Sequence, residues 1–127
     1  KDGRMTVFGG GQTRPNIHIE DMVRVYQHFL ARPDLPSGCY NAGFENLSII
    51  EVAELVQTEI PTEVLVTDTG DPRSYRQNSD KLRSTGFAPK FTVSDAIADI
   101  SRSFQEGTLP DSPECFSVEW MRQLGLQ

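Results

Sequence analysis

Helix-start signals recur along this chain, and short β-prone runs lie between them. Ser48-Ile49-Ile50-Glu51 forms a capping box, in which the serine can accept from the N3 amide and the glutamate can reach back to the N-cap. Thr92-Val93-Ser94-Asp95 repeats the pattern with aspartate in place of glutamate, which makes it a weaker signal. Because strands and helices alternate in this way, the sequence predicts an α/β fold.

The apolar periodicity gives the expected elements in more detail. Helices are predicted at 21–31, 48–60 and 92–104, with shorter ones at 79–85 and 116–124. Extended segments are predicted at 5–8, 16–19, 39–43, 62–67 and 75–78. Glycine or proline follows most of these segments and marks the turns between them.

Length and charge limit the classes of function. A chain of 127 residues has room for one domain, and it contains no apolar run near the roughly 20 residues of a membrane span. The net charge of −6 argues against nucleic acid as a partner, since such binding relies on basic residues. Two cysteines without a C-x-x-C pair and two separated histidines predict reduced thiols in the cytoplasm and no metal site.

The first informative motif is the run from Arg14 to Asp21, RPNIHIED. It resembles the R-x-x-I-H-V-x-D motif of the extended short-chain dehydrogenase/reductase family. The resemblance implies that Arg14 binds the diphosphate of a nucleotide sugar, and that the preceding strand contacts the base through Thr6 and Phe8. The alternative is an ordinary surface arginine. Asp21 is expected to cap or charge-stabilise the following helix, and His18 to be a packed or hydrogen-bonded residue on a strand.

A second arginine lies in the run Asp71-Pro72-Arg73-Ser74-Tyr75. With Lys81 and the later Gly86-Phe87-Ala88-Pro89, this run resembles the D-x-R-x-Y and L-G-[FW]-x-P stretch of the same family. There, the arginine meets the phosphates from the opposite side, so the resemblance implies that Arg73 completes an arginine pair with Arg14. Cys39-Tyr40-Asn41-Ala42-Gly43 resembles the family's Y-N-x-G strand. Arg76 and Arg83 have no such match and are expected on a solvated basic face.

Other motifs of the family are missing from the chain. Gly9-Gly10-Gly11 leads into Gln12-Thr13-Arg14-Pro15 rather than a helix, so a tight turn is expected instead of a dinucleotide loop. The Y-x-x-x-K pair is also missing, because the three tyrosines are followed at +4 by Leu30, Phe44 and Ser79. We therefore expect no catalytic, cofactor-binding or metal-binding residue in this chain.

Together, these observations predict the C-terminal, substrate-binding part of an NAD-dependent nucleotide-sugar epimerase or dehydratase. Within that family, the motif sequences resemble most closely those of enzymes in surface-polysaccharide pathways. Residues 1–107 would form this part with the last strand and helices of the Rossmann half, and residues 108–127 a Pro-marked tail with a short docking helix. NAD would bind the missing N-terminal half, so the chain alone is expected to be inactive. A homo-oligomer or self-association through exposed faces is also expected. The alternative is a small stand-alone α/β binding or interaction module.

Overall fold

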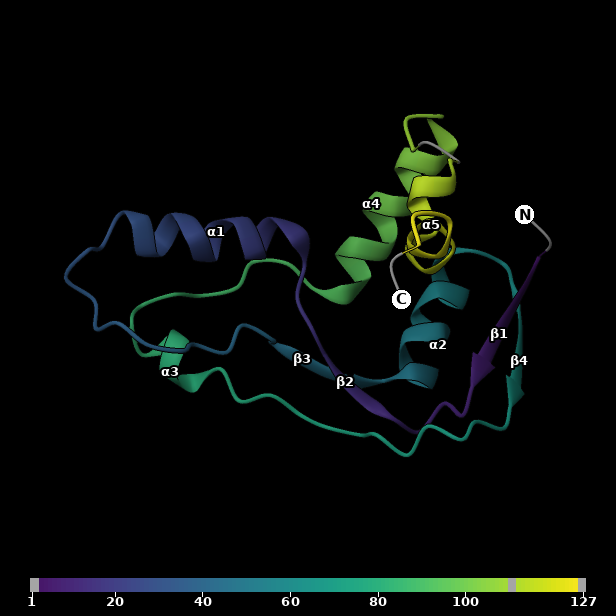
Figure 1. Cartoon of the computed structure of the whole chain (residues 1–127), viewed down its shortest axis with the longest axis horizontal. Helices are drawn as coiled ribbons and strands as arrows, with labels where there is room; N and C mark the ends of the chain where they lie inside the picture. The colour runs from purple at the N-terminus through teal and green to yellow at the C-terminus, as the bar shows by residue number, and fades with distance from the viewer. Residues whose placement is uncertain (1–2, 110–111, 126–127) are drawn as a thin grey trace.

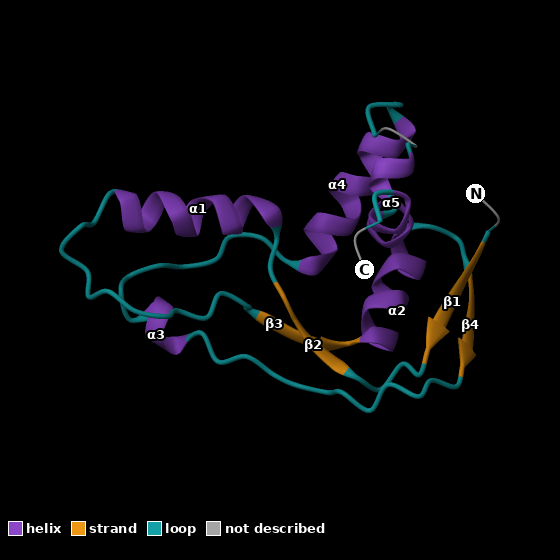
Figure 2. Ribbon diagram, viewed as in Figure 1, coloured by secondary structure: helices purple, strands orange, loops and turns teal. Residues whose placement is uncertain are grey.

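The computed structural model describes residues 3–109 and 112–125, and it shows an elongated molecule with two lobes (Figure 1). Strands β2 (Thr13–Asn16) and β3 (Glu45–Ser48) form the bridge between the lobes. One lobe holds α1 (Ile19–Leu30) and α3 (Asp80–Arg83). The other lobe holds the remaining elements: β1 (Arg4–Phe8), β4 (Glu63–Thr67), α2 (Ile49–Glu59), α4 (Val93–Gln105), the 3-10 turn η1 (Pro113–Cys115) and α5 (Ser117–Gln123). The predicted mixture of short strands and helices is confirmed (Figure 2).

A parallel pair of strands, β1 and β4, lies at one end of the molecule. Thr6 pairs with Leu65 and Phe8 with Thr67, so the pair joins segments about sixty residues apart. Side chains alternate along β1, and Val7 is buried while Thr6 and Phe8 face solvent. Helix α2 contacts both strands, which gives this small sheet one covered face.

The antiparallel pair β2–β3 carries Arg14 opposite Leu47. The pair continues one step beyond the strands, because the Phe44 N–H donates to the Asn16 carbonyl at 2.9 Å. The extended segment expected at residues 16–19 therefore lies three residues earlier. That prediction is wrong in position because residue 18 already serves as the N-cap of α1.

His18 caps α1, and Asp21 does not. The imidazole Nδ1 of His18 accepts the Glu20 N–H at 3.1 Å, and its ring stacks on Phe91 with centroids 4.7 Å apart. The ring is almost fully buried, which confirms the packed role expected for His18. Asp21 has the structural position expected for it, in the first turn of α1, but its side chain turns inward and does not cap the helix, so that part of the prediction is wrong.

The Asp21 carboxylate is fully buried and is satisfied from two directions. It accepts the backbone N–H groups of Lys90, at 3.0 and 3.1 Å, and Phe91, at 3.0 Å. It also forms an ion pair with Arg24 one turn along α1. Because a buried carboxylate without partners is very costly, these bonds fix α1 against the segment that leads into α4.

Both predicted capping boxes are confirmed. At the start of α2, the Ser48 hydroxyl accepts the Glu51 N–H at 3.2 Å, and the Glu51 carboxylate accepts the Ser48 N–H at 2.7 Å. Thr92 and Asp95 make the same reciprocal pair at the start of α4. The aspartate therefore serves as well as glutamate at this position.

The strand expected at residues 39–43 does not form. The Ser79 hydroxyl bonds both the N–H and the carbonyl of Gly43, at 3.1 and 2.8 Å, and Lys81 Nζ donates to the Cys39 carbonyl. Side chains therefore bind backbone groups that would otherwise belong to a ladder. The prediction is wrong in the described residues because a β-prone run becomes a strand only beside another strand. Residues 75–78 are likewise irregular.

The helix expected in the tail is present as α5, in the described part of residues 108–127. Phe116 and Leu124 are more than half exposed on it, so the docking surface expected for this helix remains a prediction. Residues 110–111 and 126–127 of that segment lie outside the described residues.

The main hydrophobic cluster lies between α1 and α3. Leu82 is completely buried at its centre, and Val25 and Phe87 are nearly so. Partly buried residues pack around this cluster: Ile17, Phe29, Tyr40, Ala42 and Phe44.

Replacing Leu82 by alanine should destabilise the protein by about 2–5 kcal/mol, because the truncation leaves a cavity in a packed cluster. Leu124→Ala is the matched control, since Leu124 is 53% exposed and its loss should leave the free energy of unfolding nearly unchanged. Urea unfolding followed by circular dichroism measures both values. Equal effects of the two substitutions would contradict the assigned core.

Candidate functional site

The two arginines singled out by the sequence lie together, on the carboxylate of Asp71. Arg73 Nε donates to Oδ1 at 2.7 Å, and Arg73 Nη2 donates to Oδ2 at 2.9 Å. Arg14 Nη2 reaches the same Oδ2 at 3.4 Å. We call this group, Arg14, Asp71 and Arg73, the arginine cluster. Residues far apart in the sequence thus place two permanent positive charges beside one another.

Arg14 is the more rigidly held member. Its Nη1 donates to the carbonyls of Thr13 at 2.9 Å and Arg73 at 2.6 Å, and its guanidinium lies over the Tyr75 ring, 4.9 Å from the centroid. The Arg14 side chain is 23% exposed, whereas that of Arg73 is 77% exposed. The cluster therefore combines a fixed guanidinium on β2 with a more solvent-accessible one on the adjoining loop.

Backbone contacts attach that loop to β2. The Thr13 N–H donates to the Ser74 hydroxyl at 3.0 Å, and the Tyr75 N–H donates to the Thr13 carbonyl at 3.2 Å. Gln12 extends the connection toward β1, because its amide donates to the Phe8 carbonyl at 3.2 Å and to the Asp71 carbonyl at 3.4 Å. The end of β1 and the arginine cluster are thus linked through one side chain.

A shallow hollow of about 350 Å³ opens between the end of β1 and this loop. Its lining combines glycines with short polar side chains: Gly9, Gly11, Gln12, Thr69, Asp71, Pro72 and Ser74. Phe8 and Thr6 are exposed on β1 next to this region but are not among the lining residues. The structure therefore brings Arg14 and Arg73 together beside the hollow, but neither arginine is among its lining residues, and Thr6 and Phe8 are outside the lining as well.

Electrostatics make Asp71 a persistent anion. The pKa of its carboxyl is lowered to about 2, from an ordinary value of 3.8. The main cause is the side-chain hydrogen bond from Arg73; the Arg73 backbone N–H adds to it, at 3.1 Å from Oδ1, and so does the nearby charge of Arg14. The same pairing raises the pKa of the Arg73 guanidinium.

The glycine run after β1 does not fit a dinucleotide. Gly9 and Gly10 have positive φ, and their N–H groups already donate to the carbonyls of Thr67 and Phe8. The chain then enters β2 instead of a helix, and the N-terminus of α2 already donates its Ile50 N–H to the Gly10 carbonyl. A dinucleotide loop needs free amides at a helix start, and this turn does not offer them.

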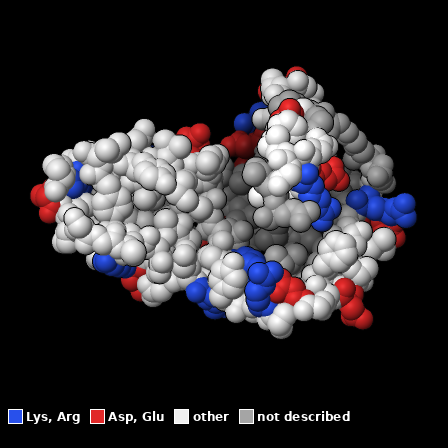
Figure 3. Space-filling view, viewed as in Figure 1, with Lys and Arg blue, Asp and Glu red and all other residues white. Residues whose placement is uncertain are grey.

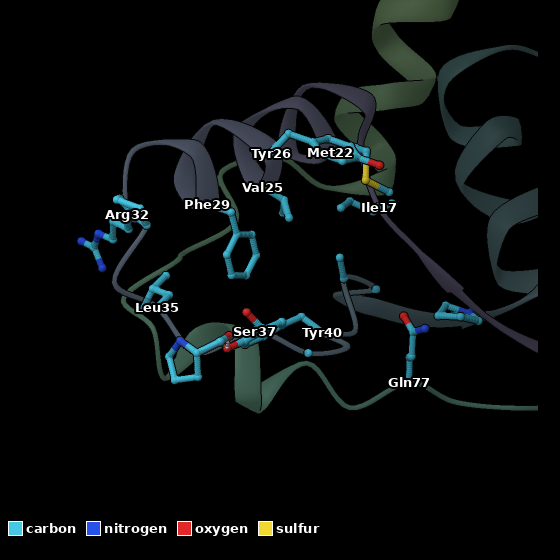
Figure 4. A pocket seen from close by; sticks show the side chains of 16 residues that line it. Ile17, Met22, Val25, Tyr26, Phe29, Arg32, Leu35, Ser37, Tyr40 and Gln77 are labelled. Carbon is cyan, nitrogen blue, oxygen red and sulfur yellow. Dashed lines mark hydrogen bonds between the residues drawn. The ribbon is translucent and has the colours of Figure 1, made fainter.

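A larger cavity lies elsewhere, between α1 and the segment that follows it, and has a volume of about 750 Å³ (Figure 4). Phe29 and Tyr40 lie in its walls, together with Met22, Val25 and Leu35. Its one basic lining residue, Arg32, donates to the Thr85 carbonyl. This apolar groove is unsuited to a diphosphate, and neither Arg14 nor Arg73 lines it.

Arg76 and Arg83 are exposed, as expected for a solvated basic face. They also line a polar cavity of about 430 Å³ together with Asp80. The Arg83 guanidinium lies over the Phe44 ring at 5.2 Å. With two arginines and one aspartate, this cavity has the same net charge as the arginine cluster, but among the described residues no hydrogen bond joins either arginine to Asp80.

Within residues 3–109 and 112–125, no group of three His, Cys, Asp or Glu side chains could hold a metal ion. Across the same described ranges, no helix combines the length and the apolar character needed to cross a membrane.

The sequence interpretation missed Asp71 as a member of the site. It treated this residue as part of a turn, although a carboxylate two positions before an arginine is a usable signal. An aspartate at that spacing can accept both the backbone N–H and the guanidinium of the arginine, as it does here. The contact between Tyr75 and Arg14 had no comparable local signal.

No protein-family model matches the chain. Solved structures do resemble it. RMD from Pseudomonas aeruginosa, in complex with NADPH, aligns with a TM-score of 0.64 and 19% identity over 76% of this chain and 34% of its own. CJ1428 from Campylobacter jejuni, a GDP-D-glycero-L-gluco-heptose synthase solved with NADPH, aligns with a TM-score of 0.66 and 22% identity. The alignment covers 79% of this chain and 32% of CJ1428. MlghC, a GDP-mannoheptose C4 reductase from Campylobacter jejuni with NADP bound, aligns with a TM-score of 0.63 and 25% identity. The alignment covers 79% of this chain and 32% of MlghC.

These similarities show a shared fold. The chain spans about a third of the length of the solved chains that it matches. All three are described with NADPH or NADP, and two are named for GDP-linked heptose chemistry. The α/β fold expected from the family resemblance is therefore confirmed in its coarse form, whereas the C-terminal position within a longer enzyme stays a prediction.

Replacing Arg73 by glutamine should raise the Asp71 pKa from about 2 toward 3.8, because the main hydrogen bond to the carboxylate is lost. Because the Asp71 pKa is lower in the folded state, the ionised carboxyl stabilises the fold at any pH above its ordinary pKa of 3.8. This contribution disappears as the pH falls from about 3.8 to about 2. Carbon-13 NMR titration of the Asp71 carboxyl measures its pKa in the wild-type protein and in the Arg73→Gln variant. Identical titration curves would show that Arg73 does not hold this carboxylate.

Proposed function

We propose that this chain is the part of a nicotinamide-dependent nucleotide-sugar epimerase, dehydratase or reductase that binds the nucleotide diphosphate of the substrate. The observation that carries the proposal is the convergence of Arg14 and Arg73 on one carboxylate. Membership of the extended short-chain dehydrogenase/reductase family and the C-terminal position within a longer enzyme belong to the same proposal.

The chemistry of the two guanidinium groups suits a diphosphate. Each is permanently charged and offers a planar fork of N–H donors that matches phosphate oxygens. Arg14 is oriented by two carbonyls and an aromatic ring, so little of its conformational freedom remains to be lost on binding. Holding the diphosphate would fix the position of the sugar, which supports catalysis by orientation.

The base would lie along β1, where Thr6 and Phe8 are exposed on the same side of the strand. An exposed aromatic ring such as that of Phe8 offers a stacking surface for a nucleobase. Because two of the similar structures are named for GDP-linked heptoses, GDP is the first nucleotide to test.

The redox step is assigned to residues outside this chain, because the sequence has neither a Y-x-x-x-K pair nor a fitting dinucleotide loop. A bound nicotinamide would supply hydride transfer, whereas the residues described here bind and orient. The resemblance implied NAD, and the similar structures support a nicotinamide cofactor more generally. The chain alone is therefore proposed to be inactive, and the complete protein to work in the cytoplasm.

The competing proposal is a stand-alone binding module without catalysis. The arginine cluster favours a stand-alone module because both guanidinium groups are already in place within this chain. The two proposals differ in one measurable property. A module should bind GDP alone as tightly as any longer protein containing it, whereas a part of an enzyme should bind more weakly alone.

Replacing Arg14 or Arg73 by alanine, in a longer protein that contains this chain, should weaken nucleotide-sugar binding by roughly ten- to a hundredfold. The expected loss reflects removal of one charge-assisted fork from the diphosphate. Arg102→Ala is the control, since Arg102 pairs with Asp99 on the exposed side of α4. Isothermal titration calorimetry with a GDP-sugar measures all three, and unchanged affinity in both arginine variants would refute the proposal.

We further propose that the chain self-associates through α1. Four apolar residues recur along its outer side with the three- and four-residue spacing of helix–helix seams, and all are exposed: Ile19, Val23, Tyr26 and Leu30. The face of the molecule over α1 and the following loop carries few charged side chains (Figure 3). In a second copy packed antiparallel, the positive end of each helix dipole would lie beside the negative end of the other.

The wild-type chain should therefore form dimers or larger species at micromolar concentration, and Tyr26→Lys should shift it toward monomer because a charge enters the seam. Phe104→Lys is the control, since Phe104 is similarly exposed on α4. Light scattering coupled to size exclusion measures the masses. A monodisperse wild-type monomer would disprove association, and an equal effect of both substitutions would remove α1 from the interface.

A further inference from the structure

We infer that Asp71 is an internal competitor for the anion site, and that it sets how much negative charge a ligand needs to occupy the arginine pair. This inference rests on the proposed function, because it assumes that Arg14 and Arg73 receive the diphosphate. It adds a specificity-determining residue, Asp71, whose charge has the same sign as the charge of the ligand.

The geometry shows Asp71 acting as a ligand of the pair. Its two oxygens accept from Nε and Nη2 of Arg73 in the side-by-side manner of a bound oxyanion, and Oδ2 also accepts from Arg14. A phosphate group would use the same N–H groups. The carboxylate and a diphosphate therefore cannot both take full advantage of the two guanidinium groups.

Counting donors gives the same result. Both Nη1 hydrogens of Arg14 are directed at the carbonyls of Thr13 and Arg73, and one Nη2 hydrogen is directed at Asp71. On Arg73, Asp71 takes Nε–H and one Nη2 hydrogen. A ligand that leaves Asp71 in place meets only the end-on Nη1–Nη2 fork of Arg73, whereas a ligand that displaces it also gains the Nε–Nη2 edge and the Arg14 Nη2 hydrogen.

Charge decides which ligands can displace it. The two arginines and one aspartate leave one net positive charge, so a monoanion gains little over the carboxylate already present. A diphosphate brings several negative charges and more oxygens, and it can take up the guanidinium N–H donors that Asp71 releases. The Asp71 side chain is 31% exposed, so it regains hydration when it turns away.

A purely supporting role for Asp71 predicts the opposite sign. If the carboxylate mainly orients Arg73, its removal should weaken anion binding because the guanidinium becomes more mobile. If it competes, its removal should strengthen binding. Asp71→Asn separates these effects, because asparagine keeps the shape and one acceptor oxygen while the charge is lost.

The experiment is an NMR titration of the 127-residue chain with inorganic pyrophosphate and with GDP, at fixed ionic strength and neutral pH. Asp71→Asn should bind both probes roughly three- to tenfold more tightly than wild type. Asp68→Asn is the control, since Asp68 is exposed on the same segment and loses the same charge. Amide spectra of each variant verify that the fold is intact.

The outcomes separate this inference from the function on which it rests. Unchanged or weaker binding by Asp71→Asn, with weaker binding by Arg14→Ala and Arg73→Ala, overturns the competitor role and leaves the proposed function standing. An equal gain in Asp68→Asn also overturns it, because the effect would then be general charge. GDP binding that is insensitive to both arginines overturns both. No binding by wild type or by Asp71→Asn overturns the competitor role, because removal of the carboxylate would then fail to open the site.

Discussion

The buried carboxylate of Asp21 is the interaction on which the arrangement of the two lobes depends. It belongs to α1, yet it takes the backbone N–H groups of residues 90 and 91, directly before α4. Glu45 on β3 adds a second connection, because its carboxylate accepts the Val93 N–H at 2.6 Å. A charge this deeply buried tolerates few alternative geometries. The helices on the two sides of the β2–β3 pair, which carries Arg14, are therefore held by polar bonds as well as by packing.

The arginine cluster depends on a different kind of support. Arg14 belongs to a paired strand, but Arg73 belongs to an irregular segment that is ordered by bonds to Thr13 and to its own Asp71. Loops attached to a rigid strand are a common place for binding residues, since the strand supplies position and the loop supplies adaptable donors. This division explains why one guanidinium is half-buried and the other mainly exposed.

Local signals in the sequence predicted what local bonds determine. Ser48 and Thr92 each start a helix because the capping partner lies three residues away, and both were predicted correctly. The α1 start was misplaced, since a histidine cap has no strong sequence signature. Residues 39–43 were predicted as a strand, and their outcome depended on Ser79 and Lys81, which are distant in sequence. For Asp71, the contact with Arg73 had a local signal, whereas its contact with Arg14 spans 57 positions and had none.

The parallel pairing of β1 with β4 has a consequence for the order of folding. Its two strands are separated by about sixty residues, which include α1, β2, β3 and α2. Closing so long a loop costs entropy before any ladder bond is gained, and chains rich in such distant contacts fold slowly. The α1 and α2 helices need only local contacts to begin forming. The end of β1 that leads to the site is therefore expected to be completed late, after the helices around it exist.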